Sequence, residues 1–319
     1  MASLRVPDVV PSPTDDCQRL KKAFEGWGTD GKAVIWILGH RNASQRKKIR
    51  DAYQQLYNKS LIDALHSEHS RHFKKAVTWW MYDPPERDAR FVKDALQKKK
   101  KGIKHLLPII EITCASSPQH LIAVRQAYCS LFDCSLEEDI LDTLPSPLGK
   151  VLAGLVRSFR YDKELVDLEV AESEAALLHE AIEKKQIDND DHVLRILTNR
   201  NFYQLRVTFQ MYKRDNGNPF DEDVKSCGNS DLESLLKAAV CCIDAPEKHF
   251  AEVIKTAVAR IGTDKKSLSR AILSRAEIDL MKIRREYLNI YAVSLDDDVI
   301  SDTSGDYKNF LLTLLGAKI

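Results

Sequence analysis

One short element recurs four times along the chain. It is an arginine followed three positions later by an aromatic residue, and its copies begin at Arg50, Arg125, Arg206 and Arg284. The copies are separated by 75, 81 and 78 residues, and each follows an apolar stretch such as Val34–Leu38. Four copies at near-equal spacing indicate an internal repeat, which restricts the chain to a modular fold.

The local pattern within the repeats is helical. Cys17, Leu20 and Ala23 fall on one face of a helix. Ser12, followed by Pro13 and by Asp15, has the features of a helix N-terminus. Alternating strand patterns joined by hairpin turns are absent. A repeat of about 75 residues has room for roughly five short helices. We therefore predict an all-α protein of four repeats with about five helices each.

Polar and proline-containing linkers divide the chain. They are Tyr82–Glu86, Ser158–Glu169 and Ile243–Pro246. The predicted repeats are residues 14–81, 86–156, 170–242 and 245–316.

Composition excludes several classes of protein. The 319 residues include 48 Lys and Arg against 47 Asp and Glu, so the net charge is +1. We expect no nucleic-acid partner, because bulk positive charge is missing. The seven cysteines form no CxxC pair, the first residues lack a signal-peptide pattern, and no apolar run reaches about 18 residues. We expect a cytoplasmic protein with reduced thiols that does not span the membrane.

A glycine-containing loop occurs in the first and fourth repeats. Gly26–Asp30 matches Arg260–Asp264. Glu68 lies 40 positions after the second glycine of the first loop, and Asp302 lies 40 positions after the glycine of the second. A tight turn presents backbone carbonyls, and a distant carboxylate can fold back to face it. Oxygen ligands with one carboxylate suit a hard cation such as calcium.

The residues after each glycine also carry a local prediction. Thr29 and Thr263 are expected to act as N-caps of the helices that follow the two loops.

In these features the sequence resembles the annexin family, over Ser12 to Gly316. Leu38–Ala43 and Arg260, in place of the first glycine of the fourth loop, are typical of its plant branch, and Asp302–Tyr307 is a specific annexin phrase. The resemblance implies four five-helix repeats in a slightly curved disc, with calcium loops on the convex face.

The resemblance also implies the ligands. In the first repeat they are the carbonyls of Phe24, Gly26 and Gly28 with the carboxylate of Glu68, and in the fourth the carbonyls of Val258, Arg260 and Gly262 with Asp302. Arg260 departs from the family pattern. A carbonyl ligand needs only backbone, although a residue other than glycine is restricted where φ is positive.

The second and third repeats depart completely. The corresponding loops are Leu96–Gly102, which is rich in lysine, and Lys184–Asp188, which has no glycine, and Thr143 stands at the acidic position of the second repeat. We expect neither repeat to bind calcium in the family's manner. The acidic run Asp188–Asp191 lacks the glycine and glutamate of an EF-hand.

These sites predict a function at membranes. One carboxylate and neutral oxygens imply weak calcium affinity, of about 10⁻⁴ to 10⁻³ M, with positions left for lipid oxygens. Lipid and calcium then strengthen each other's binding, and two sites add avidity. Trp27 and Ile261, at the loop apices, are expected to contact lipid. We predict calcium-dependent peripheral binding to anionic phospholipid membranes, and no enzymatic activity.

Several other interpretations stay open. A redox enzyme of the peroxidase type or a nucleotide hydrolase is the alternative function, and His40 occupies a region linked to peroxidase-like activity in plant annexins. Gly26, Gly28 and Gly31 form a dinucleotide fingerprint, but an amphipathic helix precedes them rather than a strand.

Three further features have a structural and a functional interpretation. Leu194–Ile196 resembles an element proposed for contact with F-actin, a weaker candidate partner, but its apolar residues favour the core. Cys114 and Cys242 resemble redox-linked thiols, and burial is the simpler account. Lys98–Lys101 is a solvated face or a contact for an anionic surface.

Overall fold

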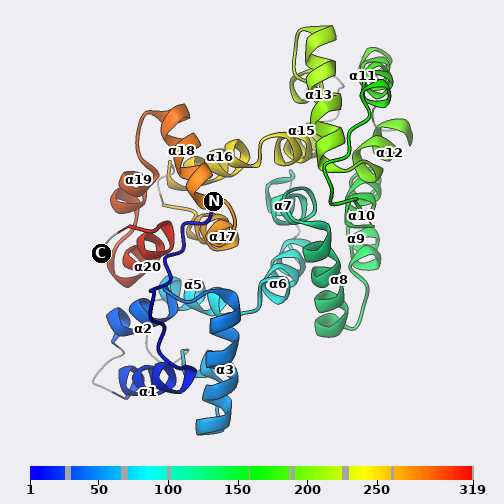
Figure 1. The fold of residues 1–319 in the computed structure, drawn as a ribbon. Coiled ribbons are helices and arrows are strands. Elements are labelled where there is room, and N and C mark those ends of the chain that lie inside the picture. Colours follow the sequence, from blue (N-terminus) through cyan, green and yellow to red (C-terminus); the bar gives the residue numbers. More distant parts are fainter. Residues whose placement is uncertain are drawn as a thin grey trace. The chain divides into compact units, whose positions relative to one another are not determined.

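The computed structural model of the chain describes residues 1–25, 30–65, 71–98, 102–157, 159–185, 187, 191–224, 230–259 and 262–317. These residues form twenty α-helices and one short 3₁₀-helix, with no strand among them (Figure 1). The predicted all-α class is therefore confirmed. The exact boundaries of the four repeats stay a prediction.

The helices fall into two compact units. The terminal unit consists of Met1–Arg87 and Phe250–Ile319, and the central unit of Asp88–His249. The terminal unit contains α1 (Pro13–Phe24), α2 (Gly31–Leu38), α3 (Ala43–Tyr57), α4 (Leu61–Ala64), α5 (Arg71–Met81), α17 (Lys265–Arg275), α18 (Leu280–Tyr291), α19 (Leu295–Asp302) and α20 (Gly305–Leu315).

The central unit contains the helices between these two groups. They are η1 (Lys104–Leu106), α7 (Leu107–Ala115), α8 (Pro118–Phe132), α9 (Leu136–Thr143), α10 (Leu148–Arg157), α11 (Leu168–Glu183), α12 (Asp191–Asn199), α13 (Phe202–Asn216), α14 (Phe220–Asp223) and α15 (Ser230–Asp244). Two helices begin in one unit and end in the other, α6 (Pro84–Leu96) and α16 (Pro246–Val258).

Side-chain caps define where many helices begin. The Ser12 hydroxyl accepts from the Asp15 N–H while the Asp15 carboxylate accepts from Ser12, so the capping box predicted at α1 is confirmed. Asn42 and Ser135 form the same box at α3 and α9. Such caps satisfy N–H groups that have no partner inside a helix.

The recurring arginine and aromatic pair has a common structural role. The aromatic residue is buried in every copy, as Tyr53, Tyr128, Phe209 and Tyr287. In three copies the arginine donates to a carbonyl in the last turn of a later helix, because such carbonyls lack partners within the helix. Arg50 reaches Met81 at 2.8 Å, Arg206 reaches Ile243 at 2.9 Å and Arg284 reaches Leu315 at 3.0 Å. The arginine thus ties the end of α5 to α3, the end of α15 to α13 and the end of α20 to α18.

The terminal unit joins both ends of the chain through one core. Helix α20 packs against α2 and α5 (Figure 1), and the rings of Phe73 and Phe310 meet edge to face at 5.8 Å. The buried Arg46 lies 3.6 Å from the Trp80 ring and pairs with Glu277 at 2.8 Å. The contacts of Phe73 with Phe310 and of Arg46 with Glu277 connect residues more than 200 positions apart, so the first and fourth predicted repeats share one core.

The central unit is closed in a similar way. Arg160 donates to the Leu197 carbonyl near the end of α12 at 2.6 Å. A side chain on Gly154 of α10 would come within 3.2 Å of Leu194 and Thr198, so the glycine permits close approach of α10 and α12. Cys114 and Cys242 are buried here, and burial raises the pKa of the Cys114 thiol. Both thiols therefore have the environment of core residues.

The helix-closing arginine can be tested at Arg206. The Arg206→Gln variant should lose about 1–3 kcal/mol of unfolding free energy, because a charged hydrogen bond to the α15 carbonyl is removed. Urea denaturation followed by circular dichroism measures this. Lys163→Gln, a change at an exposed connector residue, should stay within about 0.5 kcal/mol of the wild type. Equal midpoints for both variants would show that the arginine does not stabilise the unit.

Candidate metal centre

The loop between α16 and α17 is closed by its own backbone. The Asp264 N–H donates to the Ala257 carbonyl at 2.9 Å, across the turn. The Asp264 carboxylate then accepts from the Ser267 N–H at 3.1 Å and so caps α17. Gly262 has φ +87°, and no atom lies within 4 Å of where a β-carbon would be. The turn therefore uses a backbone conformation that favours glycine.

Asp302 is brought to this loop by a hydrogen bond. It is the last residue of α19, and its backbone carbonyl accepts from the Thr263 hydroxyl at 3.1 Å. Its side-chain Oδ2 is buried and has no hydrogen-bond partner among the residues that the structure describes. A buried carboxylate oxygen without a partner is costly unless a cation completes its surroundings. Gly262 and Asp302, predicted from the sequence as parts of one site, thus belong to segments that are tied together.

The N-caps expected at Thr29 and Thr263 are corrected by the structure. The cap of α2 is Asp30, which accepts from the Ala33 N–H at 3.1 Å, and the cap of α17 is Asp264. Thr263 instead uses its hydroxyl to hold Asp302. Threonine and aspartate are both good N-caps, and the cross-loop hydrogen bond decides which of them starts the helix. Thr29 itself lies outside the described residues.

The loop between α1 and α2 is closed by the equivalent bond. The Asp30 N–H donates to the Ala23 carbonyl at 3.0 Å, as Asp264 does to Ala257. The remaining predicted residues of this loop, Gly26, Trp27 and Gly28, lie outside the described residues, as does Glu68.

Two of the predicted carbonyl ligands stand at helix ends. Phe24 is the last residue of α1 and Val258 is the last residue of α16. Carbonyls in this position have no partner within the helix and can face a ligand. The Phe24 ring is anchored edge to face on Tyr53 at 6.4 Å. Arg260 and Ile261 lie outside the described residues.

The donors of the fourth repeat fit calcium. Asp302 has a buried carboxylate oxygen without a partner among the described residues, and carboxylate and carbonyl oxygens are the hard ligands that calcium takes. Within the described ranges no three His, Cys, Asp or Glu side chains form a metal cluster. That the remaining ligands of Asp302 are loop carbonyls stays a prediction.

A second aspartate on α19 is already engaged. Asp298 accepts from Lys255 at 2.8 Å and from the Tyr287 hydroxyl. Although burial acts in the opposite direction, these hydrogen bonds hold the pKa of Asp298 below its ordinary value. Burial, and then the bond to Asp298, raises the pKa of Tyr287. Asp298 thus anchors α19, and it is not the carboxylate that lacks a partner.

The second repeat has an anchoring aspartate equivalent to Asp298 but no carboxylate at the position of Asp302. Asp139 on α9 accepts from Lys93 at 2.6 Å and from Tyr128, as Asp298 does on α19. One helical turn later stands Thr143, whose hydroxyl approaches Asp139 at 3.4 Å. The position of Asp302 therefore holds no carboxylate here. In the third repeat, Lys184 and Lys185 follow α11, and Asp188 lies outside the described residues.

Sequence reasoning missed a group of cations beside the fourth-repeat loop. Arg71 and Lys75 of α5, with Lys265 and Lys266 of α17, line a cavity of about 320 Å³ that Thr263 also borders. Partial burial, followed by the charges of Lys265, Arg71 and Lys75, lowers the pKa of His72 in this cavity. The Lys265–Lys266 pair after the loop was the available signal, but its partners on α5 are distant in sequence.

Two other predicted elements have defined surroundings. Ile196 of the Leu194–Ile196 element is buried, whereas Arg195 is exposed and its guanidinium lies 3.2 Å from His192 Nδ1. The element therefore packs into the central unit, with Arg195 facing outward. The helix α1 directly precedes the first loop, in agreement with the argument against a dinucleotide fold. Of the Lys98–Lys101 run, only Lys98 is described.

The fold is all-helical, and two of its loops are each closed by a backbone hydrogen bond and follow a helix that ends on a carbonyl. These features define a repeat protein that can hold a hard cation. The annexin family model matches residues 15–80, 173–239 and 249–314. The chain is 58% identical to Annexin D3 of Arabidopsis thaliana, with both chains covered completely, and 41% identical to Annexin Gh1 of Gossypium hirsutum, with 99% of each covered.

Solved structures agree with this match. The structure titled annexin III has a TM-score of 0.92 at 32% identity and covers 100% of this chain and 98% of its own. A calcium-bound annexin (Sm)1 has a TM-score of 0.85 at 28% identity, with 99% and 93% covered. The chain belongs to the annexin family and is of the plant type. Calcium-dependent binding to phospholipid is the family's general activity, and calcium is the metal ion that the family binds.

The anchor of α19 predicts a pH-dependent stability. Lys255→Met should lower the unfolding free energy by about 1 kcal/mol at pH 7, since the pair with Asp298 is partly exposed. The folded pKa of Asp298 is depressed, so this contribution is complete above the unfolded value of about 3.9 and is lost as pH falls through the folded value.

Urea denaturation of wild type and variant at pH 7 and at acidic pH measures the difference. Lys282→Met, at an exposed position of α18, is the control for loss of a lysine. A difference between wild type and Lys255→Met that stays constant down to about pH 3 would contradict the ion pair.

Proposed function

We propose that the protein docks on anionic phospholipid membranes through calcium ions held in the loops of the first and fourth repeats. The observation that carries the proposal is the buried Asp302 Oδ2, which no described residue partners and which belongs to a residue tied to the loop by Thr263. A calcium ion at this point would satisfy the carboxylate and join α19 to the loop.

The proposed ligands follow the two loops. In the fourth repeat they are the carbonyls of Val258, Arg260 and Gly262 with the Asp302 carboxylate, and in the first the carbonyls of Phe24, Gly26 and Gly28 with Glu68. The matching closures at Ala257 and Ala23 support the same arrangement in both loops. Each site would have one protein carboxylate, so lipid oxygens are needed to complete tight binding.

Both loops belong to the terminal unit, which supports their acting together. The unit has a continuous core, with Phe73 on Phe310 and Arg46 on Glu277. Two weak sites on one rigid body bind a surface with an avidity that neither has alone.

The basic cavity supports a preference for anionic lipid. Arg71, Lys75, Lys265 and Lys266 border it beside Thr263 of the fourth-repeat loop. Cations near an anionic membrane contribute roughly 1 kcal/mol each close to the surface. Calcium would then bind a lipid headgroup, while Arg71 and the three lysines would attract the protein to the negatively charged membrane surface.

The proposed association is peripheral, from the cytoplasm, and needs no catalysis. In the described part of the chain no helix is long and apolar enough to cross a bilayer. A turnover assay for peroxidase and nucleotide hydrolysis on metal-free protein tests the enzymatic alternative, and turnover above that of a heat-denatured sample would support it.

The site assignment is tested by Glu68→Gln combined with Asp302→Asn. This double variant should lose calcium-dependent sedimentation with phosphatidylserine vesicles, because each site loses its only protein carboxylate. Its thermal unfolding in EDTA should stay close to that of the wild type. Asp142→Asn combined with Asp188→Asn, in the second and third repeats, is the matched control and should sediment normally. Full sedimentation of the first variant, or loss in the second, would overturn the assignment.

Trp27 and Ile261 are proposed to contact lipid at the two loop apices. Trp27→Ala should weaken vesicle binding by about 1–3 kcal/mol with the fold intact, since an indole no longer enters the interface. In the wild type, tryptophan emission should shift to shorter wavelength when calcium and anionic vesicles are both present. The difference spectrum against Trp27→Phe isolates this residue among four tryptophans. An identical shift in Trp27→Phe would show that Trp27 does not meet the bilayer.

A further inference from the structure

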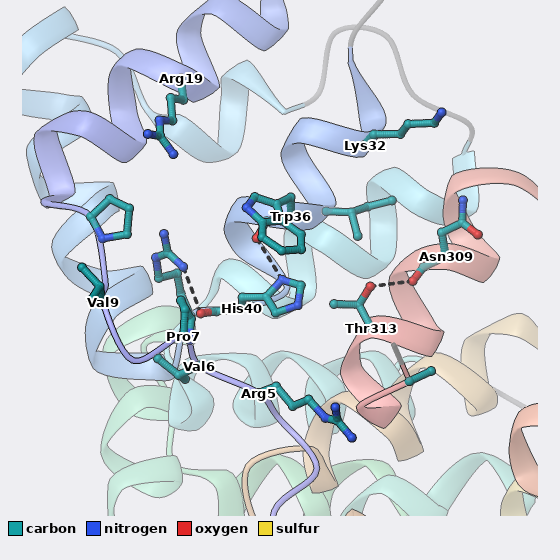
Figure 2. Close-up of a pocket in the computed structure, with 14 residues that line it drawn as sticks. Arg5, Val6, Pro7, Val9, Arg19, Lys32, Trp36, His40, Asn309 and Thr313 are labelled. Carbon is teal, nitrogen blue, oxygen red and sulfur yellow. Dashed lines mark hydrogen bonds between the residues drawn. The ribbon is translucent and has the colours of Figure 1, made fainter. Parts of the chain in front are cut away.

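A second cavity of the terminal unit has no part in the calcium site. Its volume is about 720 Å³, within the roughly 300–1,000 Å³ of small-molecule pockets. The N-terminal segment forms one wall, with Val6 and Pro7, while α2 supplies Trp36 and α20 supplies Thr313 (Figure 2). The floor and walls are mostly apolar.

The N-terminal wall is held at both ends. The Ser3 N–H donates to the Ala276 carbonyl at 2.9 Å, and its hydroxyl donates to the Leu314 carbonyl at 2.5 Å. At the other end Ser12 caps α1. The segment between them is therefore tethered to the unit at both ends.

An aromatic pair projects into this cavity. Trp36 is 64% exposed, and its ring centroid lies 4.8 Å from that of His40. His40 Nδ1 lies 2.9 Å from the Trp36 carbonyl, which can only accept, so Nδ1 carries the proton. Burial, opposed by this bond, lowers the pKa of His40, with Arg41 acting in the same direction as burial. The bond to the backbone thus orients the His40 ring, which lies beside the Trp36 indole.

Three cations surround the aromatic pair. Arg5, Arg19 and Lys32 stand around the cavity on three different segments (Figure 2). No acidic residue is among the lining residues, and no carboxylate of the described chain forms a salt bridge with these three. Arg41 differs, because it is buried and bound by Asp16 at 2.7 and 2.9 Å. The cavity therefore has three cationic side chains at its edge and an aromatic surface inside.

We propose that this cavity is a binding site for a small aromatic anion, such as an aryl phosphate or aryl carboxylate. The planar body would stack on Trp36, since stacking on an aromatic face favours planar rings. The anionic group would be held by Arg5, Arg19 or Lys32 at the edge. The site uses none of the proposed calcium ligands, so its occupation is independent of calcium.

The test is a calorimetric titration of the full chain in EDTA with 1-naphthyl phosphate. We expect saturable binding of one molecule per chain. Inorganic phosphate, which has no ring, and 1-naphthalenemethanol, which has no charge, should each bind at least about tenfold more weakly. Decyl phosphate, with an alkyl body, should also be weaker. No saturable binding of 1-naphthyl phosphate, or equal binding of decyl phosphate, would overturn the proposal.

Variants locate the site. Trp36→Leu, and separately the triple variant Arg5→Gln, Arg19→Gln and Lys32→Gln, should each weaken binding about tenfold or more. The matched control is Lys47→Gln, Lys48→Gln and Lys59→Gln, which removes the same charge from exposed positions of the same unit. Equal weakening by both triple variants would overturn the site. Glu68→Gln with Asp302→Asn should bind 1-naphthyl phosphate normally, which separates this proposal from the calcium sites.

Discussion

The hydrogen bond from an arginine of one helix to the last turn of another organises this protein. Arg50, Arg206 and Arg284 each donate to a carbonyl that its own helix leaves without a partner. The positive charge also lies at the negative end of the helix dipole. An aromatic residue one turn after each arginine is buried, so the same helix face supplies both a polar and an apolar contact. This pairing explains why the element recurs in the sequence at a nearly constant interval.

The same closure places the candidate metal centre. Once α20 is held on α18, Asp298 fixes α19 through Lys255 and Tyr287, and the end of α19 meets the loop through Thr263. Asp302 is thereby left with a buried carboxylate oxygen that no group in the described part of the chain satisfies. The second repeat keeps the anchor and has Thr143 at the decisive position. The two repeats thus share the anchoring aspartate and differ in the residue one turn later, which is where the proposed calcium ligand stands.

Much of this was predictable from the sequence, because repeats and helix signals are local. The interval between Gly262 and Asp302 predicted a shared site, and Thr263 was found to tie the two segments. The N-caps were wrong by one residue, since threonine and aspartate are both good caps and only the bond to Ala257 distinguishes them. The basic cavity was missed because Arg71 and Lys265 come from helices far apart in sequence. The aromatic cavity needed the path of the N-terminal segment, which no motif specifies.

The central claim is that calcium occupies the first and fourth repeats and neither of the others. A crystal structure of the protein grown with calcium, with an anomalous difference map, tests it most directly. The account predicts peaks beside the Asp302 and Glu68 carboxylates and none beside Thr143 or Lys184. A map without a peak at Asp302, or with a peak in the second or third repeat as strong as those in the first and fourth, would contradict it.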